Sequence, residues 1–462
     1  MDAGFETIGN ATLICHDRKP VLVTDPWLTG GAYFQSWIFS HEIPEPQMNA
    51  ILASPYVWLS HGHPDHLSAA SLKLLAGKKI LLPDHAGRRI YDGLKLQGHE
   101  VHILKDRAWT KLSERIRVLS IADYNQDAVL LIDLNGRLLI NTNDASDRGW
   151  GNFVKETAKG YKVSFLLCIS GFDDADMINY FDENGRRILP AAAKKRPFGG
   201  AVARRAERLG AKYFIPFSSM HRYQRKDSLW ANDYTTKLSD YAVGFDSQRC
   251  EILPAYVRYD CTNDRFEEIR PRERELQIVD PEKIGDSWKE PLEKKDFELA
   301  EKYFKSIEAL EEGLGFINLR VAGKDHEIKL GTRHRERGIT FEVPRNSLMA
   351  AVQYEIFDDL LIGNFMKTTL HGPWKTGKLY PYFTPYVAKY ADNGKARTRE
   401  ELHQYFKEYR ERALFDFVRH QIESKAKTLF WSVVRTDTSF YHLAKKTYHG
   451  FRKISSRNPV GV

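Results

Sequence analysis

Three histidines and one aspartate lie within six consecutive residues, because residues 61–66 read His-Gly-His-Pro-Asp-His. Imidazole and carboxylate side chains are common protein ligands of zinc, iron and manganese ions. The chain has only 16 histidines among 462 residues, so chance does not account for this density. Bends at the glycine and the proline can direct His61 and His63 to one metal ion while Asp65 and His66 reach a second. The segment therefore predicts a site for two metal ions.

A short strand and a helix must position this cluster. Residues Val57–Ser60 form an apolar run typical of a buried strand, and they lead directly into His61. Ser68 follows the cluster and can cap a helix that begins at Ala69, because a serine side chain accepts a hydrogen bond from the first helical turn. The sequence therefore predicts a strand–loop–helix unit that presents the ligands at the end of a strand.

The first 260 or so residues alternate short β-type runs with glycine turns and helical stretches. Asn135-Gly136 lies between two of the runs and predicts a tight hairpin, because both residues tolerate positive φ. Interleaved strands and helices predict sheets covered by helices, an α+β fold. The expected strands are Thr12–Cys15, Val21–Asp25, Val57–Ser60, Lys79–Pro83, Val101–Leu104, Arg117–Ile121, Ala128–Asp133, Arg137–Thr142, Ser164–Ile169 and Tyr213–Pro216. The expected helices are Ala69–Leu75, Ala86–Leu96 and Ala201–Leu209.

The composition changes between Ile269 and Pro291, where charged residues and prolines follow one another. A chain of 462 residues is also longer than most single domains. We therefore expect a metal-binding domain at residues 1–270 and a C-terminal α+β and helical domain at residues 271–462. The elements expected in the second domain are a helix at Pro291–Glu312, β-type segments at Phe316–Leu330 and Ile339–Val343, and helices at Ser347–Phe357 and over most of Arg399–Arg452.

Positive charge is concentrated at the C-terminal end. The net charge is +8, and residues 395–462 alone contain 15 basic and 7 acidic residues, the same excess. The rest of the chain is balanced, so we expect no specific nucleic-acid binding. Aromatic and basic residues alternate in this tail. They favour either a packed helical extension with a solvated basic face, or a docking surface for an acidic partner or an anionic membrane.

Two general features exclude other classes of protein. No run of apolar residues is long enough for a membrane-spanning helix, and the first residues lack the pattern of a secretory signal, so we expect a cytoplasmic protein. The four cysteines form no Cys-x-x-Cys pair, which argues against a zinc ribbon, a disulfide scaffold and a thiolate-held iron–sulfur cluster. The four are Cys15, Cys168, Cys250 and Cys261.

The cluster at residues 61–66, placed after a strand, resembles the metal motif of the metallo-β-lactamase superfamily. This resemblance implies an αββα sandwich, here with a C-terminal, largely helical extension. It also implies that Asp25, at the end of an early strand, supports the metal site from outside. Asp144, which follows the strand-like run Leu139–Asn143, then corresponds to a ligand that bridges two metal ions, and His221 corresponds to the last histidine ligand.

One position departs from the hydrolases of that superfamily. Where these enzymes supply another histidine, residues 119–125 contain none, and Asp123 stands there, with Asp127 as a second candidate. A carboxylate in place of an imidazole makes the site harder and shifts its preference from zinc toward iron or manganese. The predicted ligands are therefore His61, His63, Asp65, His66, Asp123, Asp144 and His221.

A closer resemblance, over roughly residues 10–370, is to CMP-N-acetylneuraminate hydroxylases. It rests on Ile140–Asp144, Lys283–Trp288 and Phe357–Gly363, whereas the Cys-x-His pairs of that family's Rieske domain are missing from this sequence. The resemblance implies an oxygenase with two iron ions, dioxygen as co-substrate, an external electron donor, and a small organic substrate that is anionic or similar to a sugar nucleotide. The alternative is a zinc or manganese hydrolase of phosphodiesterase or lactonase type, in which the metals activate water and Asp65 serves as a catalytic proton-transfer group.

An aromatic loop, Trp27–Trp37, follows Asp25 and contains glycines between its rings. Rings on such a loop can cover a bound organic substrate. They can equally pack into an ordinary hydrophobic core. The sequence leaves both interpretations open.

Overall fold

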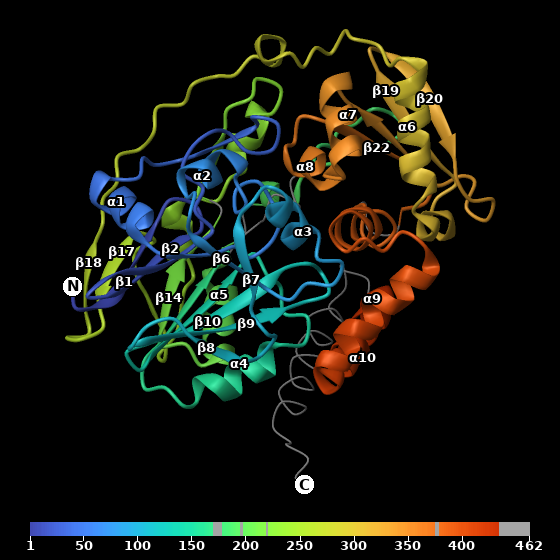
Figure 1. Cartoon of the computed structure of the whole chain (residues 1–462). Coiled ribbons are helices and arrows are strands. Elements are labelled where there is room, and N and C mark those ends of the chain that lie inside the picture. Colours follow the sequence, from blue (N-terminus) through green and yellow to red (C-terminus); the bar gives the residue numbers. More distant parts are fainter. Residues whose placement is uncertain (170–177, 195–196, 219, 375–377, 434–462) are drawn as a thin grey trace. The chain divides into compact units, whose positions relative to one another are not determined.

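The computed structural model describes residues 1–169, 178–194, 197–218, 220–374 and 378–433 (Figure 1). The chain divides into two compact units, Met1–Tyr409 and Arg410–Val462. All residues predicted as metal ligands belong to the first unit. In the second unit the described part ends with helix α10 (Leu414–Val433). The basic residues Lys445, Lys446, Arg452 and Lys453 of the predicted docking surface lie outside the described residues.

The first sheet has eight strands in the order β18-β17-β1-β2-β3-β5-β6-β7. Strands β1 to β3 are antiparallel neighbours, whereas β3, β5, β6 and β7 run parallel. Parallel neighbours need crossover connections, and helices α1, α2 and α3 lie in them. The bounds are β1 Ala3–Ile8, β2 Thr12–Asp17, β3 Lys19–Thr24, α1 Glu45–Ala53, β5 Tyr56–Trp58, α2 Ala69–Leu74, β6 Lys79–Leu82, α3 Arg89–Leu96, β7 Glu100–Ile103, β17 Val257–Asp260 and β18 Arg265–Glu268.

The second sheet has seven strands in the order β16-β14-β12-β11-β10-β9-β8. The β10–β11 hairpin turns at Asn135 and Gly136, whose φ angles of 49° and 75° confirm the predicted tight turn. The bounds are β8 Trp109–Lys111, β9 Ile116–Ala122, β10 Ala128–Leu134, β11 Arg137–Asn143, α4 Gly151–Ala158, β12 Ser164–Cys168, α5 Gly199–Leu209, β14 Tyr213–Pro216 and β16 Glu251–Ile252. A separate short pair joins β4 (Trp37–Phe39) to β15 (His221–Tyr223).

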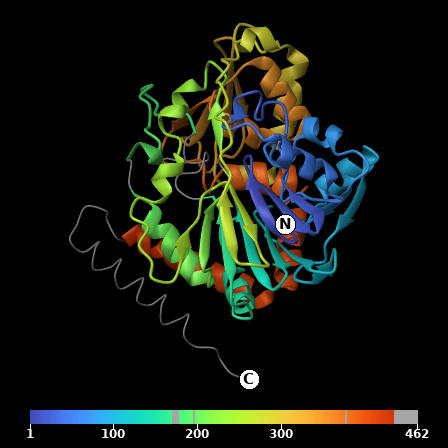
Figure 2. The same ribbon diagram turned by 90° about the vertical axis from the view of Figure 1, so that its left-hand side faces the viewer.

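The two sheets pack face to face, with helices on both outer sides (Figures 1 and 2). The layer between them contains side chains of both sheets, among them Trp58 of β5 and Phe165 of β12. Helices α1 to α3 cover the outer face of the first sheet, and α4 and α5 cover that of the second. This arrangement confirms the predicted α+β class and the metallo-β-lactamase-like αββα sandwich.

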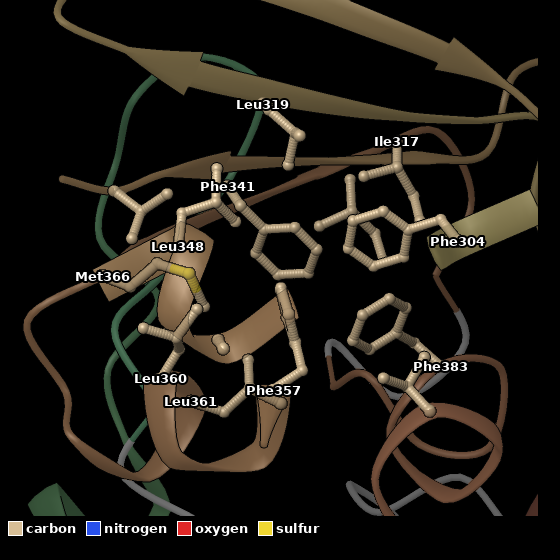
Figure 3. Packing of buried hydrophobic residues seen from close by; sticks show 14 of the residues in the cluster. Phe304, Ile317, Leu319, Phe341, Leu348, Phe357, Leu360, Leu361, Met366 and Phe383 are labelled. Atoms are coloured by element: carbon tan, nitrogen blue, oxygen red, sulfur yellow. The ribbon is translucent and has the colours of Figure 1, made fainter. Parts of the chain in front are cut away.

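A third sheet, of five strands, has the order β13-β22-β21-β19-β20 and packs against helices α6, α7 and α8. Its core is rich in phenylalanine, as Figure 3 shows. Strand β13 belongs to this sheet although it comes from the part of the chain before residue 270. The domain boundary expected at residue 270 stays a prediction. The bounds are β13 Tyr180–Phe181, α6 Lys294–Lys305, β19 Phe316–Val321, β20 Lys324–Lys329, β21 Gly338–Glu342, α7 Arg345–Tyr354, α8 Phe357–Ile362, β22 Lys367–His371 and α9 Arg399–Arg412.

Among the described residues the expected elements are present, with two differences in the C-terminal half, and the part of the helical expectation beyond residue 433 lies outside the described residues. The helix expected at Pro291–Glu312 ends at Lys305, because the backbone then turns and Glu308 N donates to Arg397 O (3.0 Å) instead of continuing the helix. The helix expected at Ser347–Phe357 is two helices, since Glu355 takes a left-handed φ of 56° between them. No described helix is both long and apolar enough to span a membrane.

Candidate metal centre

Three predicted ligands meet where strands of the two large sheets end. His61 and His63 follow β5 of the first sheet, and Asp144 follows β11 of the second. His61 Nε2 lies 2.8 Å from His63 Nδ1 and 3.9 Å from Asp144 Oδ2. One ligand atom from each of the three lies within 4.8 Å of the others. This geometry can hold a metal ion.

Asp65 and His66 form a second pair that also adjoins Asp144. His66 Nε2 lies 3.3 Å from Asp144 Oδ2 and 3.4 Å from Asp65 Oδ2. The same Asp144 oxygen therefore adjoins both histidine groups. The structure thus brings together five of the seven predicted ligands, because the Asp144 carboxylate lies near one histidine of each predicted pair. Their role as ligands stays a prediction.

The loop between β5 and α2 is a tight turn held by its own backbone. His66 N and Leu67 N both donate to His63 O, at 3.0 and 2.7 Å. At the end of the loop the Ser68 side chain accepts a hydrogen bond from Ser71 N (3.2 Å) and caps α2, as the sequence predicts. Local hydrogen bonds therefore set the path of the loop backbone that carries the histidines.

Asp25 orients His66 from outside the cluster. Its Oδ2 lies 3.1 Å from His66 Nδ1, and its Oδ1 accepts a hydrogen bond from Ser60 N (2.7 Å). The side chains of Asp25 and His66 are fully buried. A carboxylate on one ring nitrogen fixes the orientation of a ligating histidine and leaves the other nitrogen for the metal.

The electrostatics of His66 show that the site favours a cation. Its Nε2 is buried and makes no hydrogen bond of normal geometry to the described residues. Burial disfavours a charged imidazole, yet the nearby carboxylates of Asp65, Asp144 and Asp25 raise the His66 pKa well above its ordinary value. A metal ion would meet the same negative potential that holds this proton. The residues present therefore fit a bound metal.

The pKa of His61 is shifted in the opposite direction to that of His66. Burial, together with the neighbouring His66 and His63, lowers the His61 pKa well below its ordinary value. Its Nδ1 lies 2.8 Å from Ser60 Oγ. A neutral imidazole with one occupied nitrogen keeps a lone pair on the other, which is the form that binds a metal.

Hydrogen-bond donors hold both aspartates in place. Tyr33 donates from its hydroxyl to Asp65 Oδ1 (2.6 Å), and the Asn10 amide donates to Asp65 Oδ2 (2.8 Å). Ser218 donates from its hydroxyl to Asp144 Oδ1 (2.5 Å). The buried Asn10 also accepts a hydrogen bond at its backbone oxygen from Ser218 N (3.0 Å), and so connects Asp65 to the residue that bonds Asp144. Sequence reasoning missed Asn10, and the Gly-Asn turn between two β-type runs was its only signal.

His221 lies on β15 and faces the aromatic loop. Its ring stacks on the Trp37 ring, and the stack sits on the β4–β15 pair. His221 is buried, but it is not in the three-residue group whose ligand atoms converge among the described residues. Its predicted role as a metal ligand stays a prediction.

Asp123 lies at the end of β9 in its own polar group. Its Oδ1 accepts a hydrogen bond from Asn125 N (2.8 Å), and Asn125 also donates to Asp127 Oδ2 (3.1 Å). Burial and the charge of Asp127 raise the Asp123 pKa to about 8. Among the described residues, the convergent group does not include Asp123, so its role as a ligand also stays a prediction.

Two residues of the C-terminal half reach the site, although neither was predicted as part of it. Asp358, on α8, places its Oδ2 3.0 Å from His63 Nε2. Lys389 Nζ lies 3.1 Å from the same Asp358 oxygen. The only sequence signal for Asp358 was the resemblance carried by the Phe357–Gly363 stretch.

The structure places the aromatic loop in a hydrophobic core, whereas its role as a cover for a substrate stays a prediction. The rings of Trp27, Tyr33 and Trp37 are buried in one hydrophobic cluster. Tyr33 nevertheless bonds Asp65, and Trp37 stacks on His221. The loop is therefore a core element that also lines the candidate centre.

Comparison with known proteins agrees with the predicted resemblance. No protein-family model matches the chain. The chain is similar to the cytidine monophosphate-N-acetylneuraminic acid hydroxylase of Danio rerio, with 27% identity over 158 residues, which cover 32% of this chain and 27% of that protein. A human relative described as an inactive hydroxylase is 25% identical over 294 residues, which cover 60% of this chain and 58% of that protein. The matches confirm the predicted resemblance to these hydroxylases.

These similarities are partial. The matched segments span 27%, 29% and 39% of the length of three such relatives, from Danio rerio, Macaca mulatta and Gorilla gorilla gorilla. Among solved structures, an isothiocyanate hydrolase from Delia radicum gut bacteria overlaps with a TM-score of 0.37 at 14% identity, over 55% of this chain and 98% of that one. A CmlA beta-hydroxylase variant overlaps with a TM-score of 0.35 at 13% identity, over 58% and 54%.

Proposed function

We propose that the chain is a metal-dependent oxygenase that uses two iron ions and dioxygen to hydroxylate a small organic substrate. The observation that carries the proposal is the position of Asp144, whose Oδ2 lies 3.9 Å from His61 Nε2 and 3.3 Å from His66 Nε2. The sequence similarity to hydroxylases supports the oxygenase class.

The ligand pairs define which residues would hold the metals. His61 and His63 would bind one ion, Asp65 and His66 the other, and Asp144 would lie between them. Asp123 and His221 are the further ligands that the sequence predicts. Bound iron supplies the capacity to react with dioxygen, which protein side chains lack.

The surrounding residues make this centre rigid. Asp25 fixes the ring of His66, and Tyr33 and Asn10 fix the carboxylate of Asp65. Ligands held in this way keep their geometry when a metal enters or leaves. The buried ring of Trp37 packs against Tyr33 and His221 and so supports the residue that bonds Asp65.

An oxygenase of this kind needs a separate source of electrons. The four cysteines are buried and free, and the sequence shows neither a Rieske pair nor a flavin or nicotinamide fingerprint. The proposal therefore includes an external reductant. An acidic electron-transfer protein that docks on the basic tail is one such donor, and an anionic membrane is the alternative partner of that tail.

The proposed substrate class follows from the relatives. Their name gives a cytidine monophosphate derivative of an acidic sugar. For this chain we infer only the wider class, a small anionic or sugar-nucleotide-like molecule. A panel of such molecules, assayed with iron, dioxygen and a reductant, would identify the member that is hydroxylated.

A hydrolase with zinc or manganese is the second candidate. The observation that favours it is the separation of Asp123 from the convergent group, since Asp123 is the residue expected to shift the preference toward iron. In this alternative the metals lower the pKa of a bound water, and Asp65 transfers its proton.

Metal analysis and oxygen uptake distinguish the two. Protein purified without added metal should contain about two irons per chain, and it should consume oxygen when a reductant and a substrate are supplied. Stoichiometric zinc, with no oxygen uptake after iron is added, would overturn the oxygenase. Sustained turnover under strict anaerobiosis would also overturn the oxygenase and would favour the hydrolase.

A further inference from the structure

The two ring nitrogens of His63 face different partners. Its Nδ1 lies 2.8 Å from His61 Nε2, inside the candidate centre, whereas its Nε2 lies 3.0 Å from Asp358 Oδ2. A neutral imidazole carries one proton, and a carboxylate accepts but cannot donate when ionised. With the proton on Nε2, directed at Asp358, the lone pair of Nδ1 points toward the metal ligands.

Asp358 is held firmly by the core of the third sheet. Its neighbour Phe357 packs against Phe304 and Phe341, with ring centroids 5.3 and 5.1 Å apart (Figure 3). All six residues of α8 are buried. Asp392 Oδ2 accepts a hydrogen bond from Phe357 N (3.2 Å) and so fixes the first turn of the helix. The Asp358 carboxylate is therefore placed by packing rather than by chance.

Lys389 offsets the buried charge of Asp358. Its Nζ lies 3.1 Å from Asp358 Oδ2, and the exposed fractions of Lys389 and Asp358 are both 7%. A buried carboxylate without a partner would be costly, and a buried ion pair with good geometry avoids that cost. The lysine thus keeps an ionised acceptor beside His63.

We propose that Asp358 is a positioning residue of the metal centre, which holds His63 with its proton on Nε2 and so directs Nδ1 to the metal. The C-terminal sheet would then contribute an outer partner to a site whose ligands all lie before residue 270. Partners of this kind typically change metal affinity by about 10- to 100-fold. The inference rests on the proposed metal centre and adds one residue to it.

Asp359 is the matched control for this proposal. It is on the same helix and its exposed fraction is 8%, against 7% for Asp358. Its charge acts on His63 as well, but its side chain makes no hydrogen bond to the described residues. Burial raises the Asp359 pKa to about 7, so this carboxyl is only partly ionised near neutral pH. Replacing Asp359 with asparagine therefore changes little charge beside His63 and removes no hydrogen bond to its ring.

Zinc affinity of the full chain, measured by competition with a chromophoric chelator, tests the proposal. The double variant Asp358→Leu, Lys389→Met removes the acceptor and its counter-charge together, so no buried charge is left unpaired. We expect its affinity to fall by about 10- to 100-fold. The zinc affinity of Asp359→Asn should stay within about 3-fold of wild type, because Asp359 is only partly ionised near neutral pH and makes no hydrogen bond to His63. Asp358→Asn keeps an acceptor oxygen, so its zinc affinity should lie between those of the double variant and Asp359→Asn.

Nitrogen-15 spectra of the histidine rings give an independent readout. Zinc-loaded wild type should show His63 with a protonated Nε2 in slow exchange with solvent and a metal-bound Nδ1. The double variant should lose that protected proton while the melting temperature shows that it is folded. If the double variant is folded and binds zinc as tightly as wild type, Asp358 is not a positioning residue. If wild type itself binds no metal, the proposed function fails instead.

Discussion

Trp37 lies flat against His221, with ring centroids 3.4 Å apart and planes only 4° from parallel. The two residues are 184 positions apart, and the antiparallel pairing of β4 with β15 brings their strands together. Trp37 also contacts Tyr33, whose hydroxyl bonds Asp65. One buried ring therefore connects the last predicted ligand to the aromatic loop beside the candidate metal centre.

Truncation of Trp37 should destabilise the protein and disturb the centre. The ring is 3% exposed, so Trp37→Ala removes a large buried side chain and should lower the free energy of unfolding by about 3–5 kcal/mol. If His221 is a ligand, metal content should fall as well. Chemical denaturation and elemental analysis measure the two effects. Trp37→Phe, which keeps a stacking ring, is the control, and its free energy of unfolding should fall much less. Wild-type stability in Trp37→Ala would contradict the packing role.

Removal of one predicted ligand should remove metal without unfolding the chain. His63→Ala and Asp65→Ala should each lose bound metal and activity, because each deletes one member of a ligand pair. Elemental analysis and circular dichroism check the two parts of this prediction. Full metal content in either variant would show that the assignment of that ligand is wrong.

Metal binding at this centre should stabilise the folded protein. A ligand present at a hundred times its dissociation constant stabilises the folded state by about 2.7 kcal/mol. A chelator should therefore lower the melting temperature of wild type. It should leave that of His63→Ala nearly unchanged, and equal shifts in the two proteins would contradict a specific site.

Asp392 should make stability fall as pH rises from about 4 to about 7. Burial raises its pKa from 3.8 to about 7, although the hydrogen bond from Tyr303 and the charge of Arg397 oppose the rise. The folded state therefore binds this proton more tightly than the unfolded chain does. The resulting stabilisation is complete below the unfolded pKa and is lost as pH passes through the folded one.

The variant Asp392→Asn isolates this effect, because its side chain is neutral at every pH. The difference in free energy of unfolding between wild type and Asp392→Asn should shift against wild type between pH 4 and pH 7. Denaturant titrations at several pH values measure it. A difference that stays constant over this range would show that Asp392 does not titrate in the folded protein as its burial implies.

The basic tail should act through electrostatics. Charge reversal of Lys445, Lys446, Arg452 and Lys453 together should reduce turnover with an acidic electron donor, or binding to anionic vesicles, while metal content stays the same. Both interactions should weaken as the Debye length falls below about 10 Å. If the variant equals wild type in both assays at low salt, the tail has a structural role only.

Several features could be predicted from the sequence because they depend only on neighbouring residues. The run from Val57 into residues 61–66 and Ser68 contains its strand, its turn and its helix cap within a few residues, and all three are present. The Asn135-Gly136 hairpin is equally local, since positive φ at two adjacent positions is a property of those residues. Such patterns need no knowledge of the remaining chain.

Contacts across the chain were decided by tertiary structure alone. Asn10 reaches Asp65 and Asp358 reaches His63 across 55 and 295 positions of sequence, and neither residue type is distinctive in its own segment. Asp123 follows the predicted strand, yet it lies in a polar group with Asn125 and Asp127. Periodicity and turn chemistry determine where an element begins and which face is apolar. Which side chains meet at its end depends on how sheets and helices pack, and that depends on the volume and shape of the whole core.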